Sequence, residues 1–153
     1  MRKSVGGESP SGSPPVNPLE NLLGYQLRRA SQAMLDDLAS ALDEFDLRPT
    51  SVSVLLLVAS NPGITQSRIG QALSIERANT APITANFTKR GLLTRSRADG
   101  RSHGLHLTGK GKTVVVKIRK RIASHEAKFW KDTKAPERDA ALIFLRSLWK
   151  EPL

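Results

Sequence analysis

The 153-residue sequence contains no cysteine, which excludes a disulfide framework and a metal site built on thiolates. Only 5% of the residues are aromatic, and no run of 18 apolar residues could span a membrane as a helix. Residues 1–18 are rich in serine, glycine and proline, without the apolar stretch of a secretory signal. We therefore expect a flexible tail over 1–18 and a cytoplasmic protein.

Acidic residues are scarce in one part of the chain. Residues 1–75 carry six Lys/Arg and seven Asp/Glu, whereas residues 76–121 carry twelve basic and two acidic residues. The net charge of this short stretch, +10, equals the formal net charge of the whole chain. Such a block favours a polyanionic partner, because each neutralised phosphate releases condensed counterions. A basic face kept for solubility, or one attracted to anionic lipid, would leave the same signature.

The first part of the chain has a helical period. Apolar residues recur at spacings of three and four from Leu19 to Phe45, which predicts one long helix with a continuous apolar stripe. A second helix is expected over 52–60, with Thr50 or Ser51 as its cap. Its near-continuous apolar run predicts burial on most sides.

Two short helices and a hairpin are expected next. The first short helix runs from 66 to 73 behind the cap Thr65, with Ile69, Ala72 and Leu73 facing inward, and the second ends at Arg90 before Gly91. Residues 92–97 and 104–108 alternate in character around an Asp-Gly pair, which predicts a β-hairpin. A long helix capped by Thr108 and a last helix opened by Pro136 complete the order. The predicted fold is mainly α.

Two short helices followed directly by a basic hairpin are typical of a winged helix-turn-helix. The second short helix can enter the major groove of DNA, and the hairpin can reach the flanking minor groove. Arg101 lies at the hairpin tip, where an inserted arginine gains from the concentrated negative potential, and Asp99 can fix its rotamer. Three further hairpin residues are expected to meet phosphates: Arg95, Arg97 and His103.

From Leu19 to about Leu148 the chain resembles the MarR (multiple-antibiotic-resistance regulator) family of transcription regulators. The matching stretches are LLGYQLRRA near the start and ITQSRIGQALSIERANTAPITANFTKRGLLTRSRADGRSHGLHLTGKGK in the middle. The family's wing motif, Asp-x-Arg-Ser, is present as Asp99-Gly100-Arg101-Ser102. The resemblance implies a winged helix-turn-helix lobe over 49–108, with residues 19–48 and 109–153 forming a dimerisation domain.

The resemblance also implies a homodimer that reads a palindromic operator with two recognition helices. Recognition residues carried over from the family are Arg77, Asn79, Thr80 and Thr84, with Gln66 and Ser67 on the preceding helix contacting the DNA backbone. Pro82 departs from the family pattern, because a polar or basic residue usually stands there. Since proline disrupts a helix interior, we expect the recognition helix to begin near Ala78 or Asn79, or to be kinked.

An effector is implied as well: a small aromatic acid or its coenzyme A thioester, bound between the dimer base and the DNA-binding lobe and releasing a repressor from its operator. The family places a cation on the first helix near this pocket, and Arg28 or Arg29 is the candidate. Alternatively, both arginines pair with acidic neighbours on the surface. Nearby on the same helix lie Tyr25, Ser31 and Met34. The two tryptophans, Trp130 and Trp149, could anchor the dimer interface or line an aromatic pocket.

Enzymatic and metal-binding interpretations find little support. Gly109-Lys110-Gly111-Lys112-Thr113 resembles the end of a phosphate-binding loop, but His106 stands where that motif needs a glycine. His103 and His106 point to opposite faces of a strand, which disfavours a metal pair, and His125 stands alone. The acidic pairs Asp36-Asp37 and Asp43-Glu44 resemble a solvated helix face. We expect no enzyme, cofactor or metal; the alternative is a non-specific basic module that binds nucleic acid or anionic surfaces without an effector.

Overall fold

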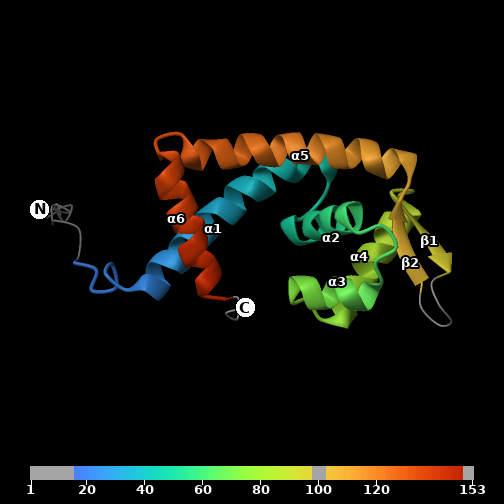
Figure 1. Cartoon of the computed structure of the whole chain (residues 1–153), viewed down its shortest axis with the longest axis horizontal. Helices are drawn as coiled ribbons and strands as arrows, with labels where there is room; N and C mark the ends of the chain where they lie inside the picture. The colour runs from blue at the N-terminus through green and yellow to red at the C-terminus, as the bar shows by residue number, and fades with distance from the viewer. Residues whose placement is uncertain (1–15, 98–102, 150–153) are drawn as a thin grey trace, which may run out of the picture. The chain divides into compact units, whose positions relative to one another are not determined.

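A computed structural model describes residues 16–97 and 103–149 (Figure 1). The chain divides into two compact units, 1–34 and 35–153. The first helix, α1 (Leu23–Leu42), begins in the first unit and ends in the second. A 3-10 turn, η1 (Asp43–Phe45), follows it, and Asp46 closes that turn in the left-handed conformation, with φ of 53°. The single helix expected over 19–45 is therefore shorter at both ends. Along the described residues, no helix is both long and apolar enough to cross a membrane.

The second helix, α2 (Pro49–Ser60), begins three residues earlier than expected. Pro49 lies in its first turn, where the missing N–H costs nothing, and Arg48 takes the N-cap position. The prediction of Thr50 or Ser51 as the cap is wrong, because both lie inside the helix. Its apolar run supplies much of the core: Val52, Val54, Leu55 and Val58.

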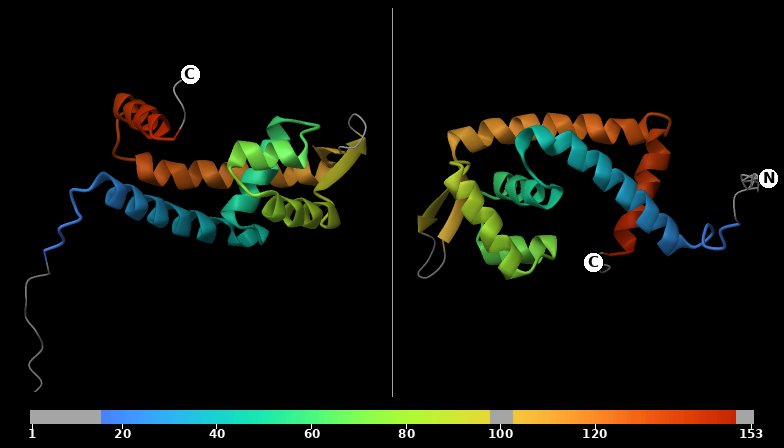
Figure 2. Two further views of the ribbon diagram at one scale, coloured as in Figure 1. Left: turned by 90° about the horizontal axis from the view of Figure 1, so that it is seen from below. Right: turned by 180° about the vertical axis from the view of Figure 1, so that it is seen from behind.

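A tight helix-turn-helix follows, made of α3 (Gln66–Leu73) and α4 (Arg77–Lys89) (Figure 2). The Thr65 hydroxyl accepts a hydrogen bond from the Arg68 N–H, which confirms the predicted cap. Ile69 is buried, whereas Ala72 is exposed, so its predicted inward orientation is wrong. Helix α4 starts at Arg77, one residue before the predicted start near Ala78 or Asn79, and it continues past Pro82 to Lys89.

The wing is a two-stranded antiparallel sheet of β1 (Leu93–Arg97) and β2 (His103–Leu107). Leu93 pairs with Leu107 at its base and Arg97 with His103 at its outer end. A bridge from Ile64 to Leu105 attaches the segment between α2 and α3 to the outside of β2. The hairpin is thereby held against the rest of the lobe.

Helix α5 (Gly109–Trp130) is fastened to the end of α4 at its first turn. The Thr108 hydroxyl accepts from the Gly111 N–H, as predicted, and donates to the Gly91 carbonyl at 2.7 Å. The Lys110 ammonium donates to the Arg90 carbonyl at 2.9 Å. The glycine- and lysine-rich stretch after Thr108 therefore begins a helix and forms no phosphate-binding loop. Its first lysine, Lys110, is bound to the Arg90 carbonyl.

The core of the lobe joins α2, α3, α4, the wing and the N-terminal half of α5, with Leu42, Phe87, Leu92 and Ile118 fully or nearly fully buried. The last helix, α6 (Ala135–Ser147), opens with Pro136 in its first turn, as expected. It contains no buried residue. Large apolar side chains on and just after it are exposed, among them Ile143, Phe144, Leu148 and Trp149.

Candidate nucleic-acid interface

Five of the residues predicted to contact DNA line one pocket of about 300 Å³. It lies where the first turns of α3 and α4 meet the two wing strands. Among the described residues that line it, none is acidic, and two are arginines, Arg77 and Arg95. Neither guanidinium has a partner among the described residues. The five predicted residues gathered here are Gln66, Ser67, Arg77, Arg95 and His103.

Thr84 positions Gln66 in this pocket. The Gln66 side-chain amide donates to the Thr84 hydroxyl, which in turn donates to the Ala81 carbonyl at 3.0 Å. The Thr84 side chain is fully buried, and so is Thr80, whose hydroxyl donates to the Glu76 carbonyl at 3.3 Å. The prediction that Thr80 and Thr84 contact DNA is therefore wrong, because both face the core with their hydroxyl groups satisfied.

The exposed face of α4 carries small apolar and amide side chains. An α-helix advances by about 100° per residue, so with Thr80, Thr84 and Phe87 buried the opposite side is presented to solvent. Pro82 lies on that exposed side. Asn86 and Lys89, which the sequence analysis did not single out, are exposed on the same side. Their position on the helix follows once Thr80 and Thr84 are known to be buried, because this fixes the rotation of α4 about its axis. The exposed face comprises Ala78, Asn79, Pro82, Ala85, Asn86 and Lys89.

The wing presents Arg95 and His103 to solvent. On the neighbouring strand positions, Ser96 and His106 share a hydrogen bond of 2.8 Å, so His106 is engaged within the sheet. Arg97 forms the last pair of the ladder through its backbone. The predicted roles of Asp99 and Arg101 lie outside the described residues.

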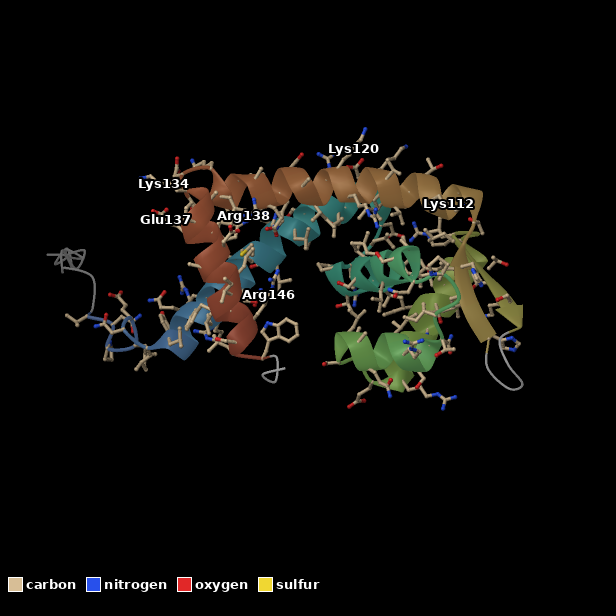
Figure 3. All side chains as sticks on the ribbon, viewed as in Figure 1. Lys112, Lys120, Lys134, Glu137, Arg138 and Arg146 are labelled. Carbon is tan, nitrogen blue, oxygen red and sulfur yellow. The ribbon has the colours of Figure 1, made fainter. Side chains whose placement is uncertain are left out.

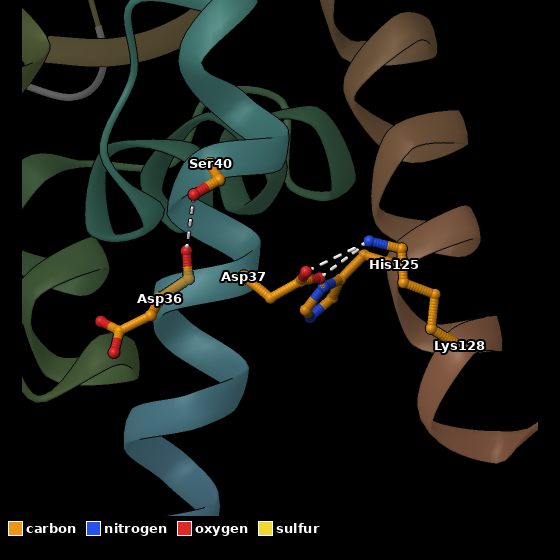
Figure 4. A network of polar contacts seen from close by, with 5 residues as sticks. All are labelled: Asp36, Asp37, Ser40, His125 and Lys128. Atoms are coloured by element: carbon orange, nitrogen blue, oxygen red, sulfur yellow. Dashed lines mark hydrogen bonds and ion pairs between the residues drawn. The ribbon is translucent and has the colours of Figure 1, made fainter.

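A polar network joins the end of α1 to α5 (Figure 4). His125 is buried, and its Nδ1 lies 2.7 Å from a carboxylate oxygen of Asp37, while the Lys128 ammonium donates to both oxygens of that carboxylate at 3.2 Å. The hydrogen bond from His125, followed by that from Lys128, lowers the pKa of Asp37 below its ordinary value of 3.8. Asp37 therefore links α1 to α5, and the expectation of a solvated helix face does not hold for its carboxylate.

The predicted effector residues lie on the part of α1 in the first unit. The Arg28 guanidinium stacks over the Tyr25 ring at 5.3 Å, and the Tyr25 hydroxyl accepts from the Asn17 amide at 2.9 Å. Arg28 and Arg29 are exposed, and within the described chain neither has an acidic partner. At about 100° per residue, Ser31 and Met34 turn progressively away from the Tyr25 face. One side of this helix therefore cannot present all five residues.

The described residues form no cluster of metal-ligating side chains. No three histidine, aspartate or glutamate side chains there are grouped as metal ligands would be. Trp130 donates its indole N–H to Glu126 at 3.1 Å and lies under the Arg138 guanidinium at 5.5 Å. This tryptophan joins the α5–α6 corner.

A sequence model described as the MarR family matches residues 45–102. The chain is similar to the transcriptional repressor CouR, solved bound to a 23-mer DNA duplex, with 34% identity over 91% of this chain and 100% of CouR and a TM-score of 0.84. A CouR structure bound to p-coumaroyl-CoA shares 34% identity over 88% and 96% of the two chains, with a TM-score of 0.78. Similarity extends to the HTH-type regulator SarZ of Staphylococcus saprophyticus, 29% identical over 100 residues, 64% of this chain and 68% of SarZ.

These likenesses cover the winged lobe and the helices on both sides of it. They agree with the element order of a winged helix-turn-helix. The chain is a regulator of transcription and not an enzyme. It belongs to the MarR family, as a repressor of the MarR type.

Proposed function

We propose that the chain represses transcription by binding a palindromic operator as a homodimer in the cytoplasm, and that a small aromatic acid or its coenzyme A thioester releases it. The observation that carries the DNA-binding part is the pocket between α3, α4 and the wing, with two unpaired arginines and no carboxylate among its described lining residues. Unpaired cations that converge on a concave surface suit a phosphate backbone. The likeness to a repressor solved on a DNA duplex supports the same assignment.

Binding to the promoter next to the chain's own gene tests this proposal. Arg77→Ala and Arg95→Ala should each weaken operator binding by roughly tenfold and lower the salt dependence of binding, because each removes a phosphate contact. Arg146→Ala, on α6, loses the same charge and should bind as the parent does. Equal weakening by all three variants would contradict a localised interface and favour the alternative, a basic module that binds any polyanion.

The exposed face of α4 supports a preference for A·T base pairs in each half-site. Asparagine pairs in a bidentate manner with adenine, and small apolar side chains contact the thymine methyl group. Asn79 and Asn86 supply the amides, and Ala78, Pro82 and Ala85 supply the apolar contacts. This face has Lys89 as its cation at the C-terminal end, so base selection here rests on amides and methyl contacts.

The exposed apolar surface of α6 supports the homodimer. Phe144 and Leu148 are 48% and 47% exposed in the single chain, and α6 has no buried residue to justify its amphipathic pattern. Exposed apolar surface of this kind marks an association site. Pairing two copies through a twofold axis would present two recognition helices to a symmetric operator.

The effector part rests on the CouR complex with p-coumaroyl-CoA and on the exposed cations of α1. A ligand that binds the folded protein raises its thermal midpoint, so p-coumaroyl-CoA, p-coumarate and coenzyme A are the three probes. We expect p-coumaroyl-CoA to stabilise the protein and to release the operator. Arg28→Gln or Arg29→Gln should weaken both effects, whereas Arg119→Gln should not. Release by coenzyme A alone would contradict an aromatic effector.

A further inference from the structure

A second cationic pocket, of about 310 Å³, lies between η1 and the middle of α5. Its lining residues are Glu44 and Phe45 of η1 and Lys117, Lys120, Arg121 and Ser124 of α5. The four α5 residues recur at spacings of three and four, which places them on one face of the helix. Figure 3 shows Lys120 in the middle of α5, well along the helix from Lys112, which lies near the wing.

The charges in this pocket are unbalanced. The Arg121 guanidinium donates to one Glu44 oxygen, through Nε at 2.7 Å and also through Nη2. Lys117 and Lys120 have no hydrogen-bond or ion-pair partner in the described part of the chain. The pocket thus holds one neutralised arginine, two free ammonium groups and a serine hydroxyl, with the half-buried Phe45 ring as an apolar wall.

A phosphate group fits this chemistry. It carries close to two negative charges and three acceptor oxygens, which suits two lysines and a hydroxyl, and its charge-assisted hydrogen bonds are the strong kind. It would also compete with Glu44 for Arg121, because guanidinium groups bind phosphate in the same forked geometry as carboxylate.

The same turn is fastened to the recognition helix. Arg90, at the C-terminal cap of α4, donates to the Phe45 carbonyl at 2.8 Å and to the Asp46 carbonyl at 3.1 Å. Glu44, on the other side, is bound by Arg121 of α5. The three residues 44–46 therefore connect the cationic pocket to the end of α4 through contacts at consecutive positions.

We propose that the pocket formed by Lys117, Lys120, Arg121 and Ser124 binds a phosphate-bearing small molecule, and that its occupancy changes operator affinity through the Arg121–Glu44 pair and the Arg90 contacts with the same turn. Binding of the phosphate is independent of the function proposed above. The coupling to DNA rests on that function, since an effector acts on a second ligand only through different affinities in two states.

Titration calorimetry on the full chain tests the binding step, with inorganic pyrophosphate and adenosine 3′,5′-bisphosphate as probes. The first reports phosphate recognition alone, and the second reports any gain from an organic group against Phe45. Lys117→Ala/Lys120→Ala should weaken both by roughly tenfold or more, because two charge-assisted contacts are lost. Lys112→Ala/Arg119→Ala removes the same charge from other faces of α5 and should change binding less than about twofold.

Three results would overturn the site. Neither probe binds, the two double variants weaken binding equally, or Lys117→Ala/Lys120→Ala weakens binding of unrelated duplex DNA as strongly as that of pyrophosphate. The last result would make these lysines contacts for a DNA backbone.

Glu44→Gln tests the coupling. Removing the competing carboxylate should tighten pyrophosphate binding, because Arg121 is freed. In the parent protein, saturating pyrophosphate should shift the operator Kd by roughly threefold or more, and in Glu44→Gln this shift should disappear. An operator Kd that ignores pyrophosphate in the parent, while calorimetry shows binding, would overturn the coupling and leave the DNA-binding function untouched.

Discussion

Gly70 of α3 packs against the turn that joins the two helices of the helix-turn-helix. A Cβ atom at this position would stand 2.8 Å from the Ile75 carbonyl oxygen, a backbone atom that cannot turn aside. Ile75 also donates its N–H to the Gly70 carbonyl at 2.9 Å, so the two segments are fixed to each other at this point. The spacing between α3 and α4, and hence the pocket formed by their first turns, depends on a missing side chain.

Gly70→Ala should therefore destabilise the protein, although alanine is the better helix former. Displacing packed backbone costs about 1–3 kcal/mol, which corresponds to a fall in Tm of roughly 3–10 °C. Gly24→Ala is the matched control, because nothing lies within 4 Å of its added Cβ. Thermal unfolding followed by circular dichroism measures both. A Gly70→Ala variant as stable as the parent would show that the helices can separate without cost.

Asp37 gives a pH dependence whose direction is fixed by its pKa. Hydrogen bonds from His125 and Lys128 lower the pKa of Asp37 in the folded state, so protonation favours the unfolded state. The stabilisation is present above the ordinary value of 3.8 and is lost as the pH falls through and below it. The Tm of Asp37→Asn should lie below that of the parent at pH 6, and the gap should narrow towards pH 3.

Asp139→Asn, an exposed carboxylate on α6, serves as the comparison for this series. If the difference in Tm between the parent and Asp37→Asn stays constant from pH 6 to pH 3, titration of the Asp37 carboxylate is not its cause. Scanning calorimetry at several pH values gives the required midpoints.

At the scale of elements, local signals predicted most helix boundaries. Thr65, Thr108, Gly91 and Pro136 act at the positions where cap and turn chemistry places them. The Asp-Gly pair and the alternating pattern on either side of it predicted the hairpin. Because α3, α4 and the wing were predicted in the right places, five of the predicted DNA-contacting residues line one pocket in the structure. The start of α2 failed for a local reason, since Pro49 in its first turn is itself a signal for a helix start. The other failures were decided by packing between distant segments, which no local pattern records.

Helix α4 and the Asp37–His125 pair show what local patterns leave open. Its apolar pattern contains little more than Ile83 and Phe87, so the rotation of the helix was underdetermined, and two buried threonines were taken for DNA contacts. Threonine can be buried in a helix because its hydroxyl bonds a carbonyl of the preceding turn. The pairing of His125 with Asp37 was likewise invisible, since it spans 88 positions.

Pro82 gives a prediction for the same helix. It is the sixth residue of α4, where proline removes the hydrogen bond to the Ala78 carbonyl and crowds it. Pro82→Ala should stabilise the protein by about 2–3 kcal/mol, or roughly 4–10 °C in Tm. Pro49→Ala, in the first turn of α2, should bring no such gain, because no bond is lost there. Equal changes in the two Tm values would contradict a local cost at Pro82.

At the scale of the whole molecule, association should depend on the exposed face of α6. Phe144→Glu/Leu148→Glu places two charges on it and should convert the proposed dimer into a monomer, because burying unpaired carboxylates is costly. Light scattering after size exclusion gives the mass directly. Arg146→Glu adds an acidic side chain to the same helix and should remain dimeric. A parent chain that is monomeric at every concentration would refute the interface.

Because α6 has no buried side chain, assembly of the protein should depend on its concentration. On the proposed dimer this helix acquires its apolar contacts only through an encounter between two molecules, so the assembly is second order in the chain. Dilution should then lower the melting temperature, whereas a self-sufficient fold melts at the same temperature at any dilution. The level of expression would thereby set the fraction of assembled regulator, and the gene dose itself would act as a control on promoter occupancy.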